Sequence, residues 1–115
     1  EINSYEKLNQ IKSEIEDRFG KVSENIIIYM YEELFENLKS KNGIEKVIQT
    51  DKSIEIVFNE KMTNELQADE LFVKAYKINK DFKLSYLFKR LRITLNINNL
   101  EKHWIYYILD LLEVI

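Results

Sequence analysis

The stretch FKLSYLFKRLRITLNI, residues 82–97, decides the fold of this chain. Apolar and polar side chains alternate along 82–88 and again along 91–97, which is the pattern of strands with one buried face. Lys89 and Arg90 separate the two runs. The stretch therefore predicts an antiparallel hairpin that turns near these two residues.

A second hairpin is predicted upstream. Residues 44–50 and 53–58 both read as strands, and Asp51 and Lys52 form a short turn between them. In each hairpin one face is apolar and needs a cover. We therefore expect one antiparallel sheet of about four strands, made of two hairpins, with helices packed on it.

In most of the remaining sequence, apolar residues recur at helical spacing. One helix is predicted from Ser4 to Phe19, and a second from Ser23 to the Asn42-Gly43 stop. A third spans 63–78, and a last one opens at Asn98, which forms a capping box with Glu101. The third helix is expected to bury Ala68, Leu71, Phe72, Ala75 and Ile78, and the last one carries Leu100, Trp104, Ile108, Leu111 and Ile115.

The element order is thus ααββαββα, which is an α+β fold in a single domain, residues 1–115. A chain of 115 residues is long enough for one such domain with a core of its own. It begins with Glu1 and ends on the apolar run 111–115, so we expect a segment of a longer protein. A trimmed small protein is the alternative.

Composition excludes several classes of function. The 17 basic and 20 acidic residues give a net charge of −3, which argues against direct nucleic-acid binding, since that requires a dense cationic surface. The lack of cysteine excludes disulfides, thiol nucleophiles and zinc–thiolate sites. No apolar run approaches the roughly 20 residues of a membrane helix, and no secretory signal is visible. We therefore expect a cytoplasmic domain that makes no membrane contact.

Carboxylates offer the first candidate chemistry. Glu14, Glu16 and Asp17 could act as paired acids and bases in a small carboxylate-dependent hydrolase. They lie on the outer side of an amphipathic helix, however, and Arg18 follows Glu14 by four residues. A solvated ion pair within the helix is therefore the simpler interpretation.

Other candidate residues point to structure more than to catalysis. His103 is the single histidine, so it lacks partners for a metal site and is expected to be a surface or packing residue. The cluster Lys89–Arg92 is expected to mark an exposed turn and an edge that discourages strand pairing. The aromatic residues Trp104, Tyr106 and Tyr107 form either a docking surface or core and rim. No cofactor is expected, and an interaction domain is favoured over an enzyme.

The motif Glu14-Ile15-Glu16-Asp17-Arg18-Phe19-Gly20 carries a resemblance to a known family. It is similar to a signature of the C-terminal domain of the bacterial transcription-repair coupling factor, Glu-(Leu/Ile)-x-Asp-Arg-(Phe/Tyr)-Gly. The later order of elements fits that domain along nearly the whole chain, although only this motif is specific. Ser23 stands where the family usually has proline.

The resemblance implies a non-catalytic, autoinhibitory domain of a large ATP-dependent DNA translocase whose motor lies outside this chain. In the family this domain packs on an N-terminal excinuclease B-like module of the same protein, and it hides the surface that binds excinuclease A. The hidden surface is released when RNA polymerase is engaged, and the parent protein also binds DNA. Family contacts at this interdomain interface map onto Glu14, Asp17 and Arg18. A free-standing protein-interaction adaptor and, less favoured, the small hydrolase are the alternatives.

Overall fold

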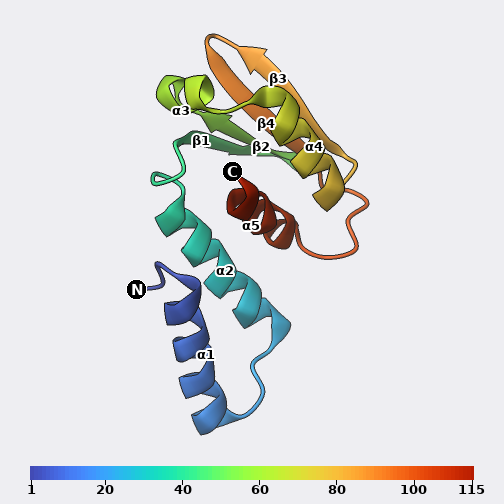
Figure 1. Ribbon diagram of the computed structural model, residues 1–115. Coiled ribbons are helices and arrows are strands. Elements are labelled where there is room, and N and C mark those ends of the chain that lie inside the picture. Colours follow the sequence, from blue (N-terminus) through green and yellow to red (C-terminus); the bar gives the residue numbers. More distant parts are fainter. The chain divides into compact units, whose positions relative to one another are not determined.

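Four strands form one antiparallel sheet in the computed structural model, which describes residues 1–115. The strand order is β1-β2-β4-β3, so each hairpin stays together and β4 joins the two (Figure 1). The strands are β1 Ile44–Gln49, β2 Ser53–Phe58, β3 Phe82–Leu87 and β4 Arg90–Asn96. The predicted α+β fold with a four-stranded antiparallel sheet is confirmed.

Strand register gathers the apolar side chains on one face of the sheet. Leu95 of β4 lies opposite Ile54 of β2 and Phe82 of β3, and Ile93 lies opposite Ile56 and Leu84. All of these except the half-buried Leu84 are buried. Complete burial of one such side chain stabilises the fold by roughly 1.5–3 kcal/mol, so this face forms the core of the sheet.

Mostly polar residues occupy the other face, although the buried Val57 also lies on it. One row across β3, β4 and β2 consists of Lys83, Thr94 and Glu55. In it Thr94 Oγ1 donates a hydrogen bond of 3.3 Å to Glu55 Oε2. Glu55 also accepts a bond of 3.1 Å from Arg92 Nη1. The sheet therefore has the one-sided pattern that an antiparallel sheet with a single covered face shows.

Three helices accompany the sheet: α3 Glu60–Glu65, α4 Ala68–Ile78 and α5 Trp104–Val114. α4 contacts β3 and α5, and α3 contacts β4. Seven side chains of α5 are buried: Trp104, Ile105, Tyr107, Ile108, Leu109, Leu111 and Leu112. α5 is thus the most buried of the helices, as its apolar sequence requires.

The predicted third helix consists of two helices. Asn59 begins α3, because its Oδ1 accepts a hydrogen bond of 2.7 Å from Met62 N, and the extended backbone of Leu66 (φ −78°, ψ 141°) ends it. α4 then starts at Ala68. The order of helical and strand regions is still the predicted one. Leu71 and Ala75 are buried as expected, whereas Ala68 and Phe72 are exposed.

The last helix begins later than predicted. Asn98 opens no helix, because its N–H instead bonds to Asn96 Oδ1 at 2.9 Å in a local turn. α5 starts at Trp104, and His103 is its N-cap. The expected capping box between Asn98 and Glu101 is therefore wrong, because short asparagine side chains compete with helix formation in this way.

Residues 1–38 form a compact unit distinct from 39–115. In it α1 Tyr5–Phe19 packs against α2 Glu24–Leu38, as Figure 1 shows. Before α1, Ile2 N donates to Glu33 Oε2 at 3.0 Å, and Ile2 O accepts from Asn37 Nδ2 at 2.6 Å. The two predicted helices are thus present and are tied together. The single-domain organisation stays a prediction.

None of the five helices combines the length and the apolar character that crossing a membrane requires.

Candidate functional site

The end of α1 carries the three residues to which the sequence motif points. Ser4 begins this helix, because its Oγ accepts a hydrogen bond of 3.1 Å from Lys7 N. Gly20 ends it with a positive φ of 83°, and its N–H bonds to Glu16 O at 2.9 Å. With its ψ of −164°, Gly20 lies in a backbone region that is open almost only to glycine, so a glycine ends the helix here, although not in the left-handed helical conformation of the usual cap.

Glu14, Asp17 and Arg18 lie on this last part of α1 and are all exposed. We call them the α1 ridge. The structure contains no ion pair between Glu14 and Arg18, so the bond expected within the helix is not formed. These charged groups are therefore free to contact another surface.

An apolar strip adjoins the α1 ridge. Glu14 and Arg18 line a shallow pocket of about 170 Å³ together with Ile11, Ile15 and Phe19. Phe19 is 80% exposed, although its spacing places it on the apolar side of the helix, and Leu8 is the one side chain that α1 buries. The end of α1 thus presents charge and exposed apolar area side by side, which suits a protein contact.

The geometry around Glu14 differs from that of an enzyme pocket. Small-molecule sites generally measure roughly 300–1,000 Å³. The pocket at Glu14 is smaller, and three of its five lining residues are apolar. No group of three or more His, Cys, Asp or Glu side chains is placed to hold a metal ion. The pocket at Glu14 is thus below the usual size of a small-molecule site.

His103 has a structural role. Its Nδ1 accepts a hydrogen bond of 3.1 Å from Ile105 N at the start of α5. Its ring lies 5.0 Å from that of Trp104. The side chain thus caps a helix and packs on an aromatic neighbour, which agrees with the expected packing role.

The aromatic residues of α5 belong to the core and its rim. Trp104 and Tyr107 are buried, and Tyr106 is half-buried. Lys102 Nζ lies 5.6 Å from the ring centre of Tyr106 and 5.3 Å from that of Tyr107, within the range of a cation–π contact. The sequence left open whether these aromatic residues form a docking surface or belong to the core and its rim. The structure shows the second arrangement.

Two arginines of the basic cluster Lys89–Arg92 are paired with carboxylates. Arg90 Nε lies 2.8 Å from Glu45 Oε2, and this hydrogen bond raises the pKa of Arg90 above its ordinary value. Arg92 Nη1 lies 3.1 Å from Glu55 Oε1. The sequence predicted that this cluster marks a sheet edge. That prediction is wrong for the two arginines, because β4 is an inner strand. The turn itself lies one residue earlier than predicted, at Phe88-Lys89.

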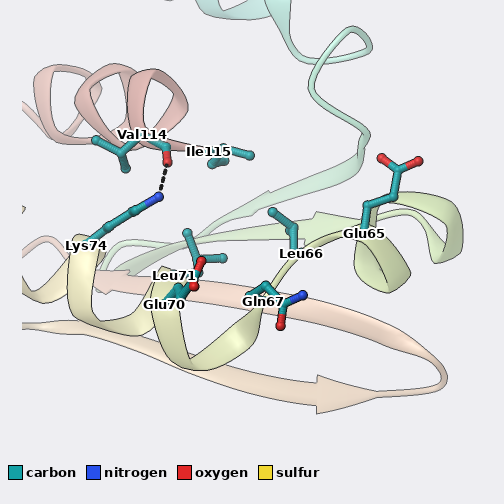
Figure 2. Close-up of a pocket in the computed structure, with 8 residues that line it drawn as sticks. All are labelled: Glu65, Leu66, Gln67, Glu70, Leu71, Lys74, Val114 and Ile115. Atoms are coloured by element: carbon teal, nitrogen blue, oxygen red, sulfur yellow. Dashed lines mark hydrogen bonds between the residues drawn. The ribbon is translucent and has the colours of Figure 1, made fainter.

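A different pocket lies where α4 and α5 approach each other (Figure 2). It measures about 170 Å³, and Lys74 Nζ crosses it to donate a hydrogen bond of 3.4 Å to Val114 O. A lysine that donates to the last carbonyls of a helix stabilises the C-terminal end of that helix. The pocket contains none of the residues that the sequence singled out: its lining is Glu65, Leu66, Gln67, Glu70, Leu71, Lys74, Val114 and Ile115.

An exposed apolar run at the end of β3 was not predicted. Tyr86, Leu87 and Phe88 are 63%, 47% and 77% exposed. The signal was present in the sequence, because three consecutive apolar residues break the alternation of the strand just before the basic turn.

Comparison with known proteins gives a match in structure alone. The chain is similar to the crystal structure of the C-terminal domain of transcription-repair coupling factor, with a TM-score of 0.74 and 19% sequence identity. The match covers 97% of this chain and 68% of that one. No protein-family model and no curated protein sequence matches. The resemblance drawn from residues 14–20 is thus confirmed as a shared fold.

Proposed function

We propose that this chain is a non-catalytic, autoinhibitory domain of a transcription-repair coupling factor. In this proposal the α1 ridge of Glu14, Asp17 and Arg18 binds an excinuclease B-like module elsewhere in the same protein. The contact masks the surface by which that module binds excinuclease A. The parent protein is a cytoplasmic ATP-dependent DNA translocase. When it binds RNA polymerase, the contact between the α1 ridge and the module is released.

The observation that supports the proposal most directly is the position of the motif in the fold. The fold is similar to that of a coupling-factor C-terminal domain along 97% of the chain. Within this fold Glu14, Asp17 and Arg18 are exposed on one helix end beside the exposed ring of Phe19. The residues that the family resemblance selects are thus available for a contact.

The energetics of such a contact suit a switch. An exposed ion pair contributes about 0.2–1 kcal/mol, so a few of them hold two free proteins together only weakly. Within one chain, a tether raises the effective concentration to roughly the millimolar range, and weak contacts then suffice for masking. Because the closed state is favoured by only about 2–3 kcal/mol in this proposal, polymerase binding can shift the population to the open state.

Charge reversal in the full-length protein tests this role. Asp17→Arg and Arg18→Glu should each weaken the closed state by about 1.4 kcal/mol, a factor of about ten in the closed–open equilibrium. The apparent affinity for excinuclease A, measured by surface plasmon resonance, should then rise by about fivefold to tenfold. Lys7→Glu is the matched control, since Lys7 is exposed on the first part of the same helix.

The proposal is wrong for these residues if both variants bind excinuclease A no more tightly than the wild type. Circular dichroism and thermal unfolding establish that the variants are folded. The control variant should leave the affinity unchanged.

A further inference from the structure

The tip of the β3–β4 hairpin has a surface that folding alone does not explain. Tyr86, Leu87 and Phe88 are consecutive, apolar and exposed. Side chains on both faces of the strand are uncovered here, and Figure 1 shows the turn extending beyond the first turn of α4, on the side of α3. A run of three exposed apolar residues is a defect in a fold unless it serves binding.

The turn residues are unfavourable for the conformation they adopt. Leu87 pairs with Arg90, so the loop consists of two residues, Phe88 and Lys89. Both have positive φ, 53° and 63°. A loop of this kind strongly prefers Asn-Gly, because large side chains are strained in the left-handed region. Backbone strain of this kind concentrates where the side chains have a function.

β3 is also an edge strand. It pairs with β4 on one side, and the sheet ends at its other side. An edge strand offers unpaired N–H and C=O groups to an extended peptide, which can add to the sheet as a further strand.

The hairpin differs in charge from the rest of the chain. Residues 82–100 contain four basic side chains and no acidic one, while the other 96 residues hold all 20 acidic side chains and the remaining 13 basic ones. Of the four, Arg90 and Arg92 are paired with Glu45 and Glu55. Lys83 and Lys89 are exposed without a partner.

We propose that the β3 edge and the hairpin tip bind an extended acidic peptide segment of a partner protein. The peptide pairs with β3, its carboxylates face Lys83 and Lys89, and an apolar side chain packs on Leu87 and Phe88. A peptide is favoured over nucleic acid because Glu45 and Glu55 lie beside the arginines, and because two unpaired lysines are few for a phosphate backbone. This surface lies in the unit 39–115 and shares no residue with the α1 ridge, which lies in 1–38.

Selection from a displayed library of random 12-residue peptides, with the 115-residue chain as bait, tests the proposal. The enriched peptides should share acidic residues with at least one apolar residue among them. Titration of the tightest peptide should shift the amide NMR signals of residues 83–89 more than any others. Lys83→Glu combined with Lys89→Glu should lower its affinity at least about tenfold in fluorescence anisotropy.

Lys61→Glu combined with Lys77→Glu is the control, because it makes the same change in net charge at exposed helix positions. This variant should bind the peptide like the wild type. Equal loss of affinity in both double variants would mean that only net charge matters, and would overturn the proposal.

A second variant separates binding from folding. Phe88→Asn combined with Lys89→Gly relieves the strained turn, so the melting temperature should rise by about 4 °C or more while peptide affinity falls. Any of the following results also overturns the proposal: no enriched peptides, a consensus without acidic residues, unchanged affinity in this variant, or displacement of the peptide by a single-stranded oligonucleotide. Dimerisation through β3 that blocks the peptide also overturns it.

Discussion

At the scale of single residues, two glycines show how differently the same backbone requirement can be met. Gly20 and Gly43 both have positive φ, 83° and 69°. A Cβ atom added at Gly20 would meet nothing within 4 Å, whereas one at Gly43 would overlap the side chain of Met62 on α3. Gly43 O also accepts a hydrogen bond of 2.8 Å from Asn59 N. Gly43 is thus needed both for its conformation and for the close approach of α3.

The two glycines predict a difference that urea denaturation can measure. Gly20→Ala should lower the free energy of unfolding by roughly 1–3 kcal/mol, because only the strain of alanine at a positive φ with an extended ψ is added. Gly43→Ala should lower it by a further 1–3 kcal/mol or so, because Met62 must also move. Equal effects of the two substitutions would contradict the close packing between Gly43 and Met62.

Whether a single side chain is exposed could be predicted more reliably from its charge than from its helical spacing. Glu14, Asp17 and Arg18 were placed correctly on an outward side of α1. Phe72 was predicted to be buried from its helical spacing, yet it is 45% exposed and lies against Tyr76, with ring centres 6.1 Å apart. Spacing identifies a helix face but gives no information about whether another element covers it.

At the scale of elements, local signals determined what could be predicted. The strands and the first two helices follow from periodicity and from caps such as Ser4. The break at Leu66 has no glycine or proline to mark it. It follows instead from tertiary contacts: buried Thr63 of α3 accepts a hydrogen bond of 3.0 Å from Leu91 N of β4, while α4 packs on β3 and α5. Because α3 packs on β4 whereas α4 packs on β3 and α5, this part of the chain forms two helices and not one.

The start of α5 gives a prediction at this scale. His103→Ala removes the acceptor for Ile105 N and should lower the free energy of unfolding by about 1 kcal/mol. His103→Asn, which keeps a capping acceptor, should retain most of the stability. Chemical denaturation of both variants measures the difference, and equal losses would show that the cap contributes little.

At the scale of the whole molecule, local sequence patterns do not predict which strands pair when those strands are distant in sequence. One sheet of two hairpins could be predicted, because each had an apolar face to cover. The order β1-β2-β4-β3 could not, since it depends on which strand of the second hairpin meets β2. The division into 1–38 and 39–115 was equally absent from local patterns, as no Gly-, Pro- or Ser-rich linker marks it.

The two proposed binding surfaces lie in different units, which makes them separable by experiment. The α1 ridge and Phe19 belong to 1–38, and the tip with Phe88 belongs to 39–115. Both phenylalanine rings are strongly exposed, at 80% and 77%. Each ring can therefore report on its own surface, and each serves as a control for the other.

Hydroxyl-radical footprinting of the full-length protein tests the masking role of the α1 ridge most directly. Compared with the 115-residue chain, Phe19 should be oxidised several-fold more slowly in the resting full-length protein, while Phe88 keeps its reactivity. Binding of RNA polymerase should restore the reactivity of Phe19. Oxidation of Phe19 in the resting protein at the rate seen in the 115-residue chain, with Phe88 unchanged, would contradict the account.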